Sequence, residues 1–173
     1  MLLPRQLARS LFTTQFWATL IREDRFIMTP FAVAPLRAYD RDAWETLARG
    51  YHTFYEEAWP PETYARVWER LREDREIHAL GAYQDDRLVG FVHYLFHGHV
   101  WQPAVCYLQD LFVAESLRGS GVGRAMIAQV EQIARNRGAC RVYWLTKHDN
   151  ERARRLYDKV ATYSGFIRYE DPL

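Results

Sequence analysis

The chain has 173 residues, of which 49% are hydrophobic and 15% are aromatic. This length predicts one domain, and the composition excludes a wholly disordered or collagen-like chain. The 23 Lys and Arg nearly balance the 22 Asp and Glu, which leaves a net charge of +1. Such a balance argues against a protein that binds nucleic acid or a membrane surface through its overall charge. The sequence contains no run of 18 or more apolar residues, so no spanning helix is expected.

Two cysteines, Cys106 and Cys140, are too few for a disulfide scaffold. They show no metal-ligand spacing, so we interpret both as packing residues and expect no metal site. A reducing compartment is the default for such a chain, and we expect a cytoplasmic protein.

Residues 1–27 differ in composition from the rest of the chain. They carry Arg5 and Arg9 and no acidic residue before Glu23. This is typical of a mitochondrial presequence, whereas three Thr and a Gln interrupt the apolar run that a secretory signal requires. The preferred interpretation is an N-terminal extension that is not part of the domain, which then comprises residues 28–173.

The periodicity of the apolar residues is readable from residue 31 onward. It predicts, in chain order, a strand at 31–37, a helix starting at Asp40 or Asp42, a second helix at 62–74, a hairpin of strands at 78–83 and 88–96, and a strand at 105–113. Pro35 favours an edge position for the first strand. Trp59-Pro60-Pro61 separates the two helices.

The second half of the chain predicts four further elements. They are an amphipathic helix after residue 121 that ends at Gly138, a strand at 141–146, a helix capped by Asp149 or Asn150, and a terminal strand at 166–169. The element order predicts an α/β fold, with a mixed antiparallel/parallel twisted sheet flanked by helices.

A glycine-rich loop, Arg118-Gly-Ser-Gly-Val-Gly-Arg124, carries the most chemical information. Glycines at alternate positions let backbone N–H groups converge at a helix N-terminus, which favours phosphate oxygens, and the two arginines add positive charge. The structural alternative is a tight turn that uses Gly only for packing. The spacing fits neither a dinucleotide fingerprint nor a P-loop, because the third Gly is replaced by Arg124 and no Gly-Lys-Ser/Thr is present.

This loop, with its neighbours, resembles the GNAT superfamily of acetyl-CoA-dependent N-acetyltransferases. The residues that carry the resemblance are Asp110-Leu-Phe-Val113, Arg118-Gly-Ser-Gly-Val-Gly123, Asn150, Ala153, Leu156-Tyr157 and Gly165-Phe166. It extends from about residue 31 to the end and is most specific over 105–169. The polyamine and histone acetyltransferase-like subgroups look closest, because they share a strand like 107–113 and a run like 156–160.

The resemblance implies a GNAT-like acyl-CoA N-acyltransferase fold with acetyl-CoA as cosubstrate. The pyrophosphate would be held by the glycine-rich loop, and the pantetheine arm by the main chain of the preceding strand and by Asn150. The implied cofactor-binding residues are Leu111, Phe112, Val113, Arg118, Gly119, Ser120, Gly121, Val122, Gly123, Arg124 and Asn150. A simple helix cap is the alternative for Asn150, and the two roles can coexist.

The resemblance assigns Tyr157 to the general-acid position, where it would protonate the departing thiolate. The alternative is a core tyrosine. The general base stays open, because Gln109 stands where some polyamine enzymes carry Glu. Asp110 is the nearest carboxylate and is predicted to be catalytic, although a structural role is an alternative. His93 and His97 are further candidates.

Family members line the acceptor pocket with the loop between the first two helices, here residues 51–59. Aromatic and acidic side chains in this loop suit a cationic amine, so Tyr55, Glu56 and Trp59 are the predicted substrate-binding residues. A solvated acidic turn over core aromatics is the alternative.

We therefore expect transfer of acetyl from acetyl-CoA to a primary amine of a small molecule, polyamine-like or amino-acid-like. A protein or histone-type lysine acetyltransferase and a non-catalytic CoA-binding module are the alternatives. A homodimer is expected, because the terminal strand leaves an edge that a second copy can cover.

Overall fold

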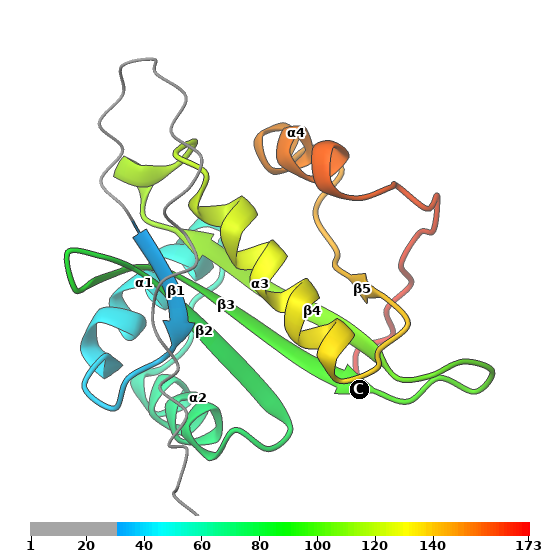
Figure 1. The fold of residues 1–173 in the computed structure, drawn as a ribbon. Coiled ribbons are helices and arrows are strands. Elements are labelled where there is room, and N and C mark those ends of the chain that lie inside the picture. Colours follow the sequence, from blue (N-terminus) through cyan, green and yellow to red (C-terminus); the bar gives the residue numbers. More distant parts are fainter. Residues whose placement is uncertain (1–30) are drawn as a thin grey trace, which may run out of the picture.

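A computed structural model describes residues 31–173 as a five-stranded sheet with helices on both faces (Figure 1). The strands lie in the order β1-β2-β3-β4-β5, and every neighbouring pair is antiparallel except β4 and β5. Their bounds are β1 Phe31–Pro35, β2 Ile77–Gln84, β3 Arg87–His97, β4 Val105–Val113 and β5 Val142–Tyr143. The mixed sheet is confirmed. The predictions for residues 1–27 and for a domain start at Met28 fall outside the described residues.

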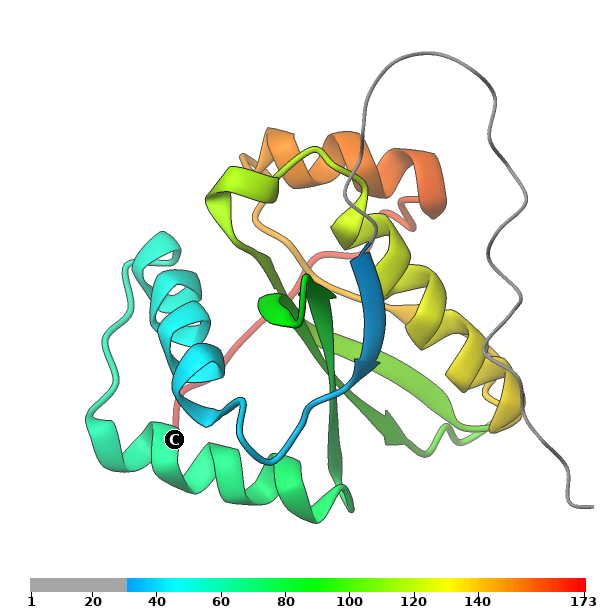
Figure 2. The ribbon, with the colours of Figure 1, turned by 60° about the vertical axis from the view of Figure 1, so that its left-hand side comes forward.

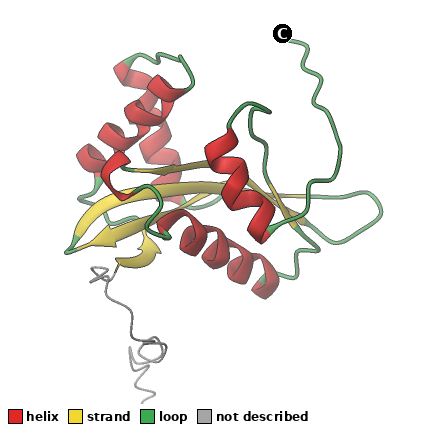
Figure 3. Ribbon diagram, turned by 90° about the horizontal axis from the view of Figure 1, so that it is seen from above, coloured by secondary structure: helices red, strands yellow, loops and turns green. Residues whose placement is uncertain are grey.

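Helices cover the two faces of the sheet unequally (Figures 2 and 3). Helices α1 (Arg41–Phe54) and α2 (Pro61–Glu73) pack on one face, and α3 (Val122–Asn136) packs on the other. A short 3-10 turn, η1 (Glu115–Leu117), leads from β4 to the glycine-rich loop, and α4 (Glu151–Val160) follows β5.

The α3 face holds the aliphatic core. Helix α3 buries Val122, Met126, Val130 and Ala134 against the sheet, with Ile133 half-buried beside them. The predicted apolar stripe is confirmed, and the helix ends at Gly138, whose φ is 72°. Positive φ carries little cost for glycine, which explains the stop.

The opposite face holds an aromatic core. Trp44 of α1 packs against Tyr64 and Trp68 of α2, with ring centroids 6.5 and 5.4 Å away. Phe91 of β3 completes the cluster, and all four rings are at most 3% exposed. The helical spacing of the apolar residues predicts that Trp44 lies on the buried face of its helix, and this prediction is confirmed.

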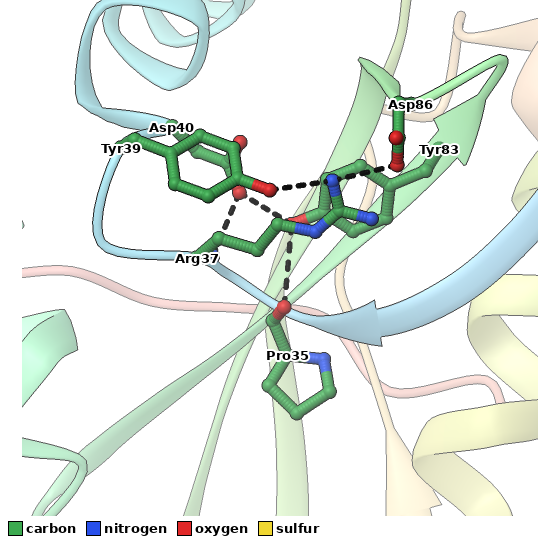
Figure 4. Close-up of polar contacts among 6 residues, drawn as sticks. All are labelled: Pro35, Arg37, Tyr39, Asp40, Tyr83 and Asp86. Carbon is green, nitrogen blue, oxygen red and sulfur yellow. Dashed lines mark hydrogen bonds and ion pairs between the residues drawn. The ribbon is translucent and has the colours of Figure 1, made fainter.

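The start of α1 is anchored by a buried polar network (Figure 4). Asp40 occupies the N-cap position but makes no side-chain cap bond. Its carboxylate instead accepts hydrogen bonds from the Tyr83 hydroxyl at 2.5 Å and from the Arg37 backbone N–H at 2.7 Å. The Arg37 guanidinium lies over the Tyr83 ring and reaches Asp86 in the β2–β3 turn. The helix start predicted at Asp40 is confirmed, but the Asp40 side chain does not cap the helix, because the Tyr83 hydroxyl and the Arg37 N–H take up the carboxylate.

The hairpin and the first strand agree with the sequence-based predictions. Asp85 and Asp86 both have positive φ, 47° and 62°, as a two-residue hairpin turn requires. Among the described residues, strand β1 lies at the edge of the sheet and pairs only with β2, which accommodates Pro35.

Two predictions near the C-terminus fail. The strand expected at 141–146 pairs only through Val142 and Tyr143, because β5 diverges from β4 after these residues. The strand expected at 166–169 does not form, and residues 161–173 carry no helix or strand. A β5 of two residues offers too short an edge for this segment to pair with. Phe166, Ile167 and Tyr169 are consequently 71–87% exposed.

Within residues 31–173, none of the helices combines the length and apolar character needed to cross a membrane.

A substitution at Gly90 of β3 can test how closely β3 and β4 approach each other. A Cβ at this position would lie 2.8 Å from the Phe112 carbonyl oxygen and 3.3 Å from Met126 Cε. Gly90→Ala must displace a backbone group, which costs about 1–3 kcal/mol, and about 2–4 °C of Tm is lost per kcal/mol at this size. Thermal unfolding should show this loss for Gly90→Ala. Gly98→Ala is the control, because a Cβ there meets nothing within 4 Å. Equal melting temperatures for both variants would contradict the packing described.

Candidate active site

The candidate site begins where β4 and β5 stop pairing. Only Cys106↔Val142 and Tyr107↔Tyr143 are in register between these parallel strands, whereas β4 continues to Val113. Beyond Tyr107, the β4 edge that faces away from β3 therefore has no partner strand within residues 31–173. Unpaired backbone N–H and C=O groups need hydrogen-bond partners. This edge can accept an extended chain such as a pantetheine arm.

The glycine-rich loop lies at one end of this edge, between η1 and α3. Gly121 is the N-cap of α3 with φ 95°, and no described side chain caps this helix end. The first N–H groups of a helix lack intrahelical partners, and a Cβ at Gly119 or Gly121 would meet nothing within 4 Å. The loop is thus open around uncapped amides, which fits a pyrophosphate group.

The two flanking arginines differ in their surroundings. Arg124 is exposed in the first turn of α3. Arg118 folds back toward β4, where its Nε donates to the Val113 carbonyl oxygen at 3.3 Å and its guanidinium lies over the Phe112 ring. Both keep positive charge next to the loop.

Asn150 and Tyr157 of the β5–α4 segment line the other side of the opening. Asn150 Oδ1 accepts from the Ala153 N–H at 3.3 Å, and its amide donates to Thr146 Oγ1 at 3.1 Å. The helix cap predicted for Asn150 is confirmed. Tyr157 packs its ring on Trp144, 5.3 Å between centroids. Burial raises the pKa of Tyr157 to about 12, with a further contribution from Tyr55, so the phenol carries its proton at neutral pH.

Tyr55, at the C-terminal end of α1, connects the two sides. Burial raises the pKa of its hydroxyl, and the charge of Asp110 raises it further. The side chains of Thr146 and Asn150 act on the same hydroxyl and lower its pKa, which offsets part of the rise. Lys147 Nζ lies 5.4 Å from the Tyr55 ring centroid. The predicted substrate-binding Tyr55 therefore sits next to Asp110, Tyr157 and the cofactor-side Asn150.

Asp110 lies opposite His93 on the face of the sheet that α1 covers. The register shifts there, so that His93 pairs with Asp110 but Tyr94 pairs with Leu108, and Gln109 is an extra residue in β4. His93 Nδ1 is 2.9 Å from Asp110 Oδ2, and the Trp44 indole Nε1–H donates to His93 Nε2 at 3.0 Å.

A second group acts on the Asp110 carboxylate. The Tyr51 hydroxyl of α1 favours its ionised form and so lowers its pKa. Burial pushes the pKa of Asp110 upward, but His93 and Tyr51 together outweigh burial and hold the pKa below its ordinary value. The carboxylate is therefore ionised at neutral pH and can bind an ammonium group.

The loop between α1 and α2 supplies aromatic and acidic groups. Trp59 is 49% exposed, lies edge-on to His52 and donates to Glu57 Oε2 at 3.4 Å. Glu57 also influences the pKa values of Tyr51, His52 and Tyr55, which places its charge beside the aromatic cluster. Glu56 is exposed, with φ 59°. Of the two acids, Glu57 is therefore the one that interacts with this aromatic cluster.

The further base candidate His97 lies at the other end of β3, paired with Val105. Its ring contacts the Gly98 carbonyl oxygen and the Tyr143 hydroxyl. The structure does not bring it to Asp110.

The sequence does not predict that Trp44 belongs to the site, and it predicts Tyr51 only as part of the loop 51–59, not as a residue that acts on Asp110. Both fall on the apolar stripe of their helix, where periodicity indicates core packing. The N–H of a buried Trp and the O–H of a buried Tyr usually have hydrogen-bond partners. This tendency is the only feature of the sequence that could have indicated a polar role for these two residues.

Among residues 31–173, no group of three His, Cys, Asp or Glu side chains is arranged to hold a metal ion.

Comparison with known proteins adds the family. A family model described as "Acetyltransferase (GNAT) family" matches residues 44–163. The D-amino-acid N-acetyltransferase HPA3 of Saccharomyces cerevisiae is 34% identical over 152 residues, which cover 85% of this chain and 94% of the yeast protein. A thialysine N-epsilon-acetyltransferase of Mus musculus is 35% identical over 82 residues, about half of each chain (47% and 48%).

Solved structures share the fold. A probable acetyltransferase has a TM-score of 0.72 at 26% identity and covers 83% of this chain, with 97% of its own chain matched. The aminoglycoside N-acetyltransferase AAC(6')-Iy, solved in complex with CoA, has a TM-score of 0.73 at 17% identity, with 83% and 95% covered.

Proposed function

The chain belongs to the GNAT acetyltransferase family, and from that premise we propose that it transfers the acetyl group of acetyl-CoA to the primary amine of a small amino-acid-like or polyamine-like molecule. One observation carries the proposal: Asp110, an ionised carboxylate bonded to His93, and Tyr157, a protonated phenol packed on Trp144, both interact electrostatically with Tyr55 at the end of α1. Acyl transfer to an amine needs a group that binds the ammonium and a group that protonates the thiolate.

Each residue has a defined task in this mechanism. Acetyl-CoA supplies the activated acetyl group as a thioester. The uncapped amides at Gly121–Arg124 would hold its pyrophosphate, and the free β4 edge at Leu111–Val113 would hold its pantetheine arm. A β4 backbone N–H directed at the thioester oxygen would stabilise the negative charge that develops there on attack.

Asp110 would bind the ammonium form of the acceptor and orient its nitrogen. The amine loses one proton before it attacks, and the ionised carboxylate, directly or through water, is the nearest group that can take it. The carbon–sulfur bond then breaks, and Tyr157 would donate its hydroxyl proton to the leaving sulfur. The raised pKa of Tyr157 keeps that proton available at neutral pH. The attacking nitrogen would lose its second proton, directly or through water, to the Tyr157 phenolate.

Amino-acid acceptors have the stronger support within the proposed class. Both curated relatives are named for the acetylation of an amino acid, a D-amino acid in one and thialysine in the other. Lys147 beside Tyr55 adds a positive charge at the mouth of the site, which suits the carboxylate of an amino acid.

A screen of acceptors tests the function. D- and L-amino acids, thialysine, polyamines, aminoglycosides and lysine peptides are each incubated with acetyl-CoA, and released thiol is measured. We expect turnover with an amino acid and a loss of about 10²-fold in kcat for Tyr157→Phe, because a general acid acts in the transition state. Tyr143→Phe is the control, since Tyr143 contacts His97 away from the site. Turnover of Tyr157→Phe at the wild-type rate would show that the thiolate leaves without this residue.

The glycine-rich loop is tested separately by acetyl-CoA binding. Gly121→Asp adds a negative charge among the amides and should weaken binding by at least about tenfold, the scale of one lost charge-assisted hydrogen bond. Gly138→Asp is a matched control, because both glycines have positive φ and open space at Cβ. Calorimetry that finds the same affinity for both variants would refute the loop as the pyrophosphate site.

The proposal includes a homodimer. Strand β5 pairs on one side only within residues 31–173, and the segment after α4 exposes Phe166, Ile167 and Tyr169 beyond it. Apolar surface next to an open strand edge is commonly covered by another chain, and here a second copy is the proposed partner. Light scattering should give a particle of about twice 20.5 kDa. A monomer at micromolar concentration would contradict this proposal.

A reducing compartment, the cytoplasm, is also proposed. Cys106 and Cys140 are both free thiols, and burial raises the pKa of Cys106 to about 11, which keeps it unreactive.

A further inference from the structure

The environment of His93 determines which of its nitrogens carries the proton. The Trp44 indole N–H can only donate a hydrogen bond, and it points at His93 Nε2 at 3.0 Å. Nε2 must therefore present its lone pair. In the neutral imidazole the proton then resides on Nδ1, which is 2.9 Å from Asp110 Oδ2 and donates to it.

This arrangement leaves His93 without a free lone pair. The Nε2 lone pair accepts from Trp44, and Nδ1 is already protonated. His93 cannot take the proton of an incoming amine without losing the bond to Trp44. The histidine closest to the carboxylate is thus unsuited to act as a base.

Packing holds the side chains of Trp44 and His93 in place. Trp44 is 1% exposed and lies against Trp68 with ring centroids 5.4 Å apart. The His93 ring stacks on Phe91 with centroids 4.5 Å apart and an interplanar angle of 29°. Trp44, His93 and Asp110 come from α1, β3 and β4, so the chain of hydrogen bonds crosses three separately packed elements.

We infer that Trp44 and His93 are positioning residues for acetyl transfer: Trp44 occupies the Nε2 lone pair of His93 and so holds the ring in place, and the Nδ1–H of His93 in turn orients the Asp110 carboxylate toward the acceptor ammonium. The inference rests on the proposed function in one respect, the role of Asp110 in acceptor binding. It assigns a specific effect on amine binding to Trp44, which is linked to Asp110 only through His93. Tyr51 also favours the ionised form of the same carboxylate, and the carboxylate retains acceptor capacity for the ammonium beside the bond from His93.

The tautomer is measured first, without any substrate. Long-range ¹H–¹⁵N spectra of the full chain should show a protonated Nδ1 and an unprotonated Nε2 for His93. Trp44→Phe keeps an aromatic ring but removes the donor to Nε2. Because the Asp110 carboxylate can only accept, Nδ1 should stay protonated, whereas the ¹⁵N resonance of Nε2 should shift once its hydrogen bond to the indole is lost. Trp68→Phe is the matched control, because it truncates the neighbouring indole of the same cluster and leaves the bond to His93 intact. A wild-type spectrum with protonated Nε2, or no difference between the two variants, would overturn the inference.

Kinetics with an accepted amine then separate positioning from packing. Trp44→Phe should lower kcat/KM for the amine by about tenfold, the effect of one hydrogen bond to an ionic network, and leave KM for acetyl-CoA unchanged. Trp68→Phe should leave both near the wild-type values. Equal losses in the two variants, at matched melting temperatures, would refute the specific role of Trp44.

His93 variants distinguish a positioning residue from a base. His93→Asn places an amide donor near the position of Nδ1 and contains no base, so it should retain most of the activity. His93→Leu removes the donor and should lose about tenfold or more in kcat/KM for the amine. Inactivity of both variants would indicate a base and contradict the inference. If the wild-type protein acetylates no amine, the proposed function fails. The tautomer measurement still tests the hydrogen bonds from Trp44 to His93 and from His93 to Asp110, because it needs no substrate.

Discussion

The separation of β4 from β5 after two paired residues is the constraint on which the rest of the site depends. A parallel strand pair that continued to Val113 would satisfy the β4 backbone and leave no place for an extended ligand. Because pairing stops at Tyr143, the chain after β5 swings away, and α4 packs Leu156 toward Gly123 at the start of α3. Asn150 and Tyr157 then face the same opening as the glycine-rich loop.

The aromatic face of the molecule serves both stability and chemistry. Trp44 and Phe91 are among the most buried side chains of the domain, yet the polar edge of Trp44 contacts His93 and the ring of Phe91 supports it. An aliphatic core in this place could fill the same volume but could not hold a buried charge. Aromatic residues with polar atoms let one layer pack densely and still hydrogen-bond the network around Asp110.

Elements whose signal is local could be predicted from the sequence, and those that depend on distant partners could not. The stripe of α3, the turn at Asp85 and Asp86 and the cap at Asn150 follow from residues within a few positions of one another, and all three are confirmed. The length of β5 and the absence of a strand at 166–169 depend on what neighbouring backbone is available, which no local pattern records. The same holds for the site: the glycine loop is readable as a motif, whereas the bond from Trp44 to His93 joins residues 49 positions apart.

The network of Asp40, Arg37 and Tyr83 affects how a loss of activity caused by a substitution in this domain should be interpreted. It fixes the first turn of α1 to β2, and α1 carries Trp44, Tyr51 and Tyr55 in sequence along its length. A helix behaves as a stiff rod, so a small rotation at its start reaches every side chain that it presents further along. A substitution at Tyr83 would therefore be recorded as an enzymatic defect although none of the three anchoring residues is assigned to the site. In this fold, the distance of a residue from the reacting groups is therefore a poor guide to its effect on activity. Whether the residue holds α1 in place is a better guide.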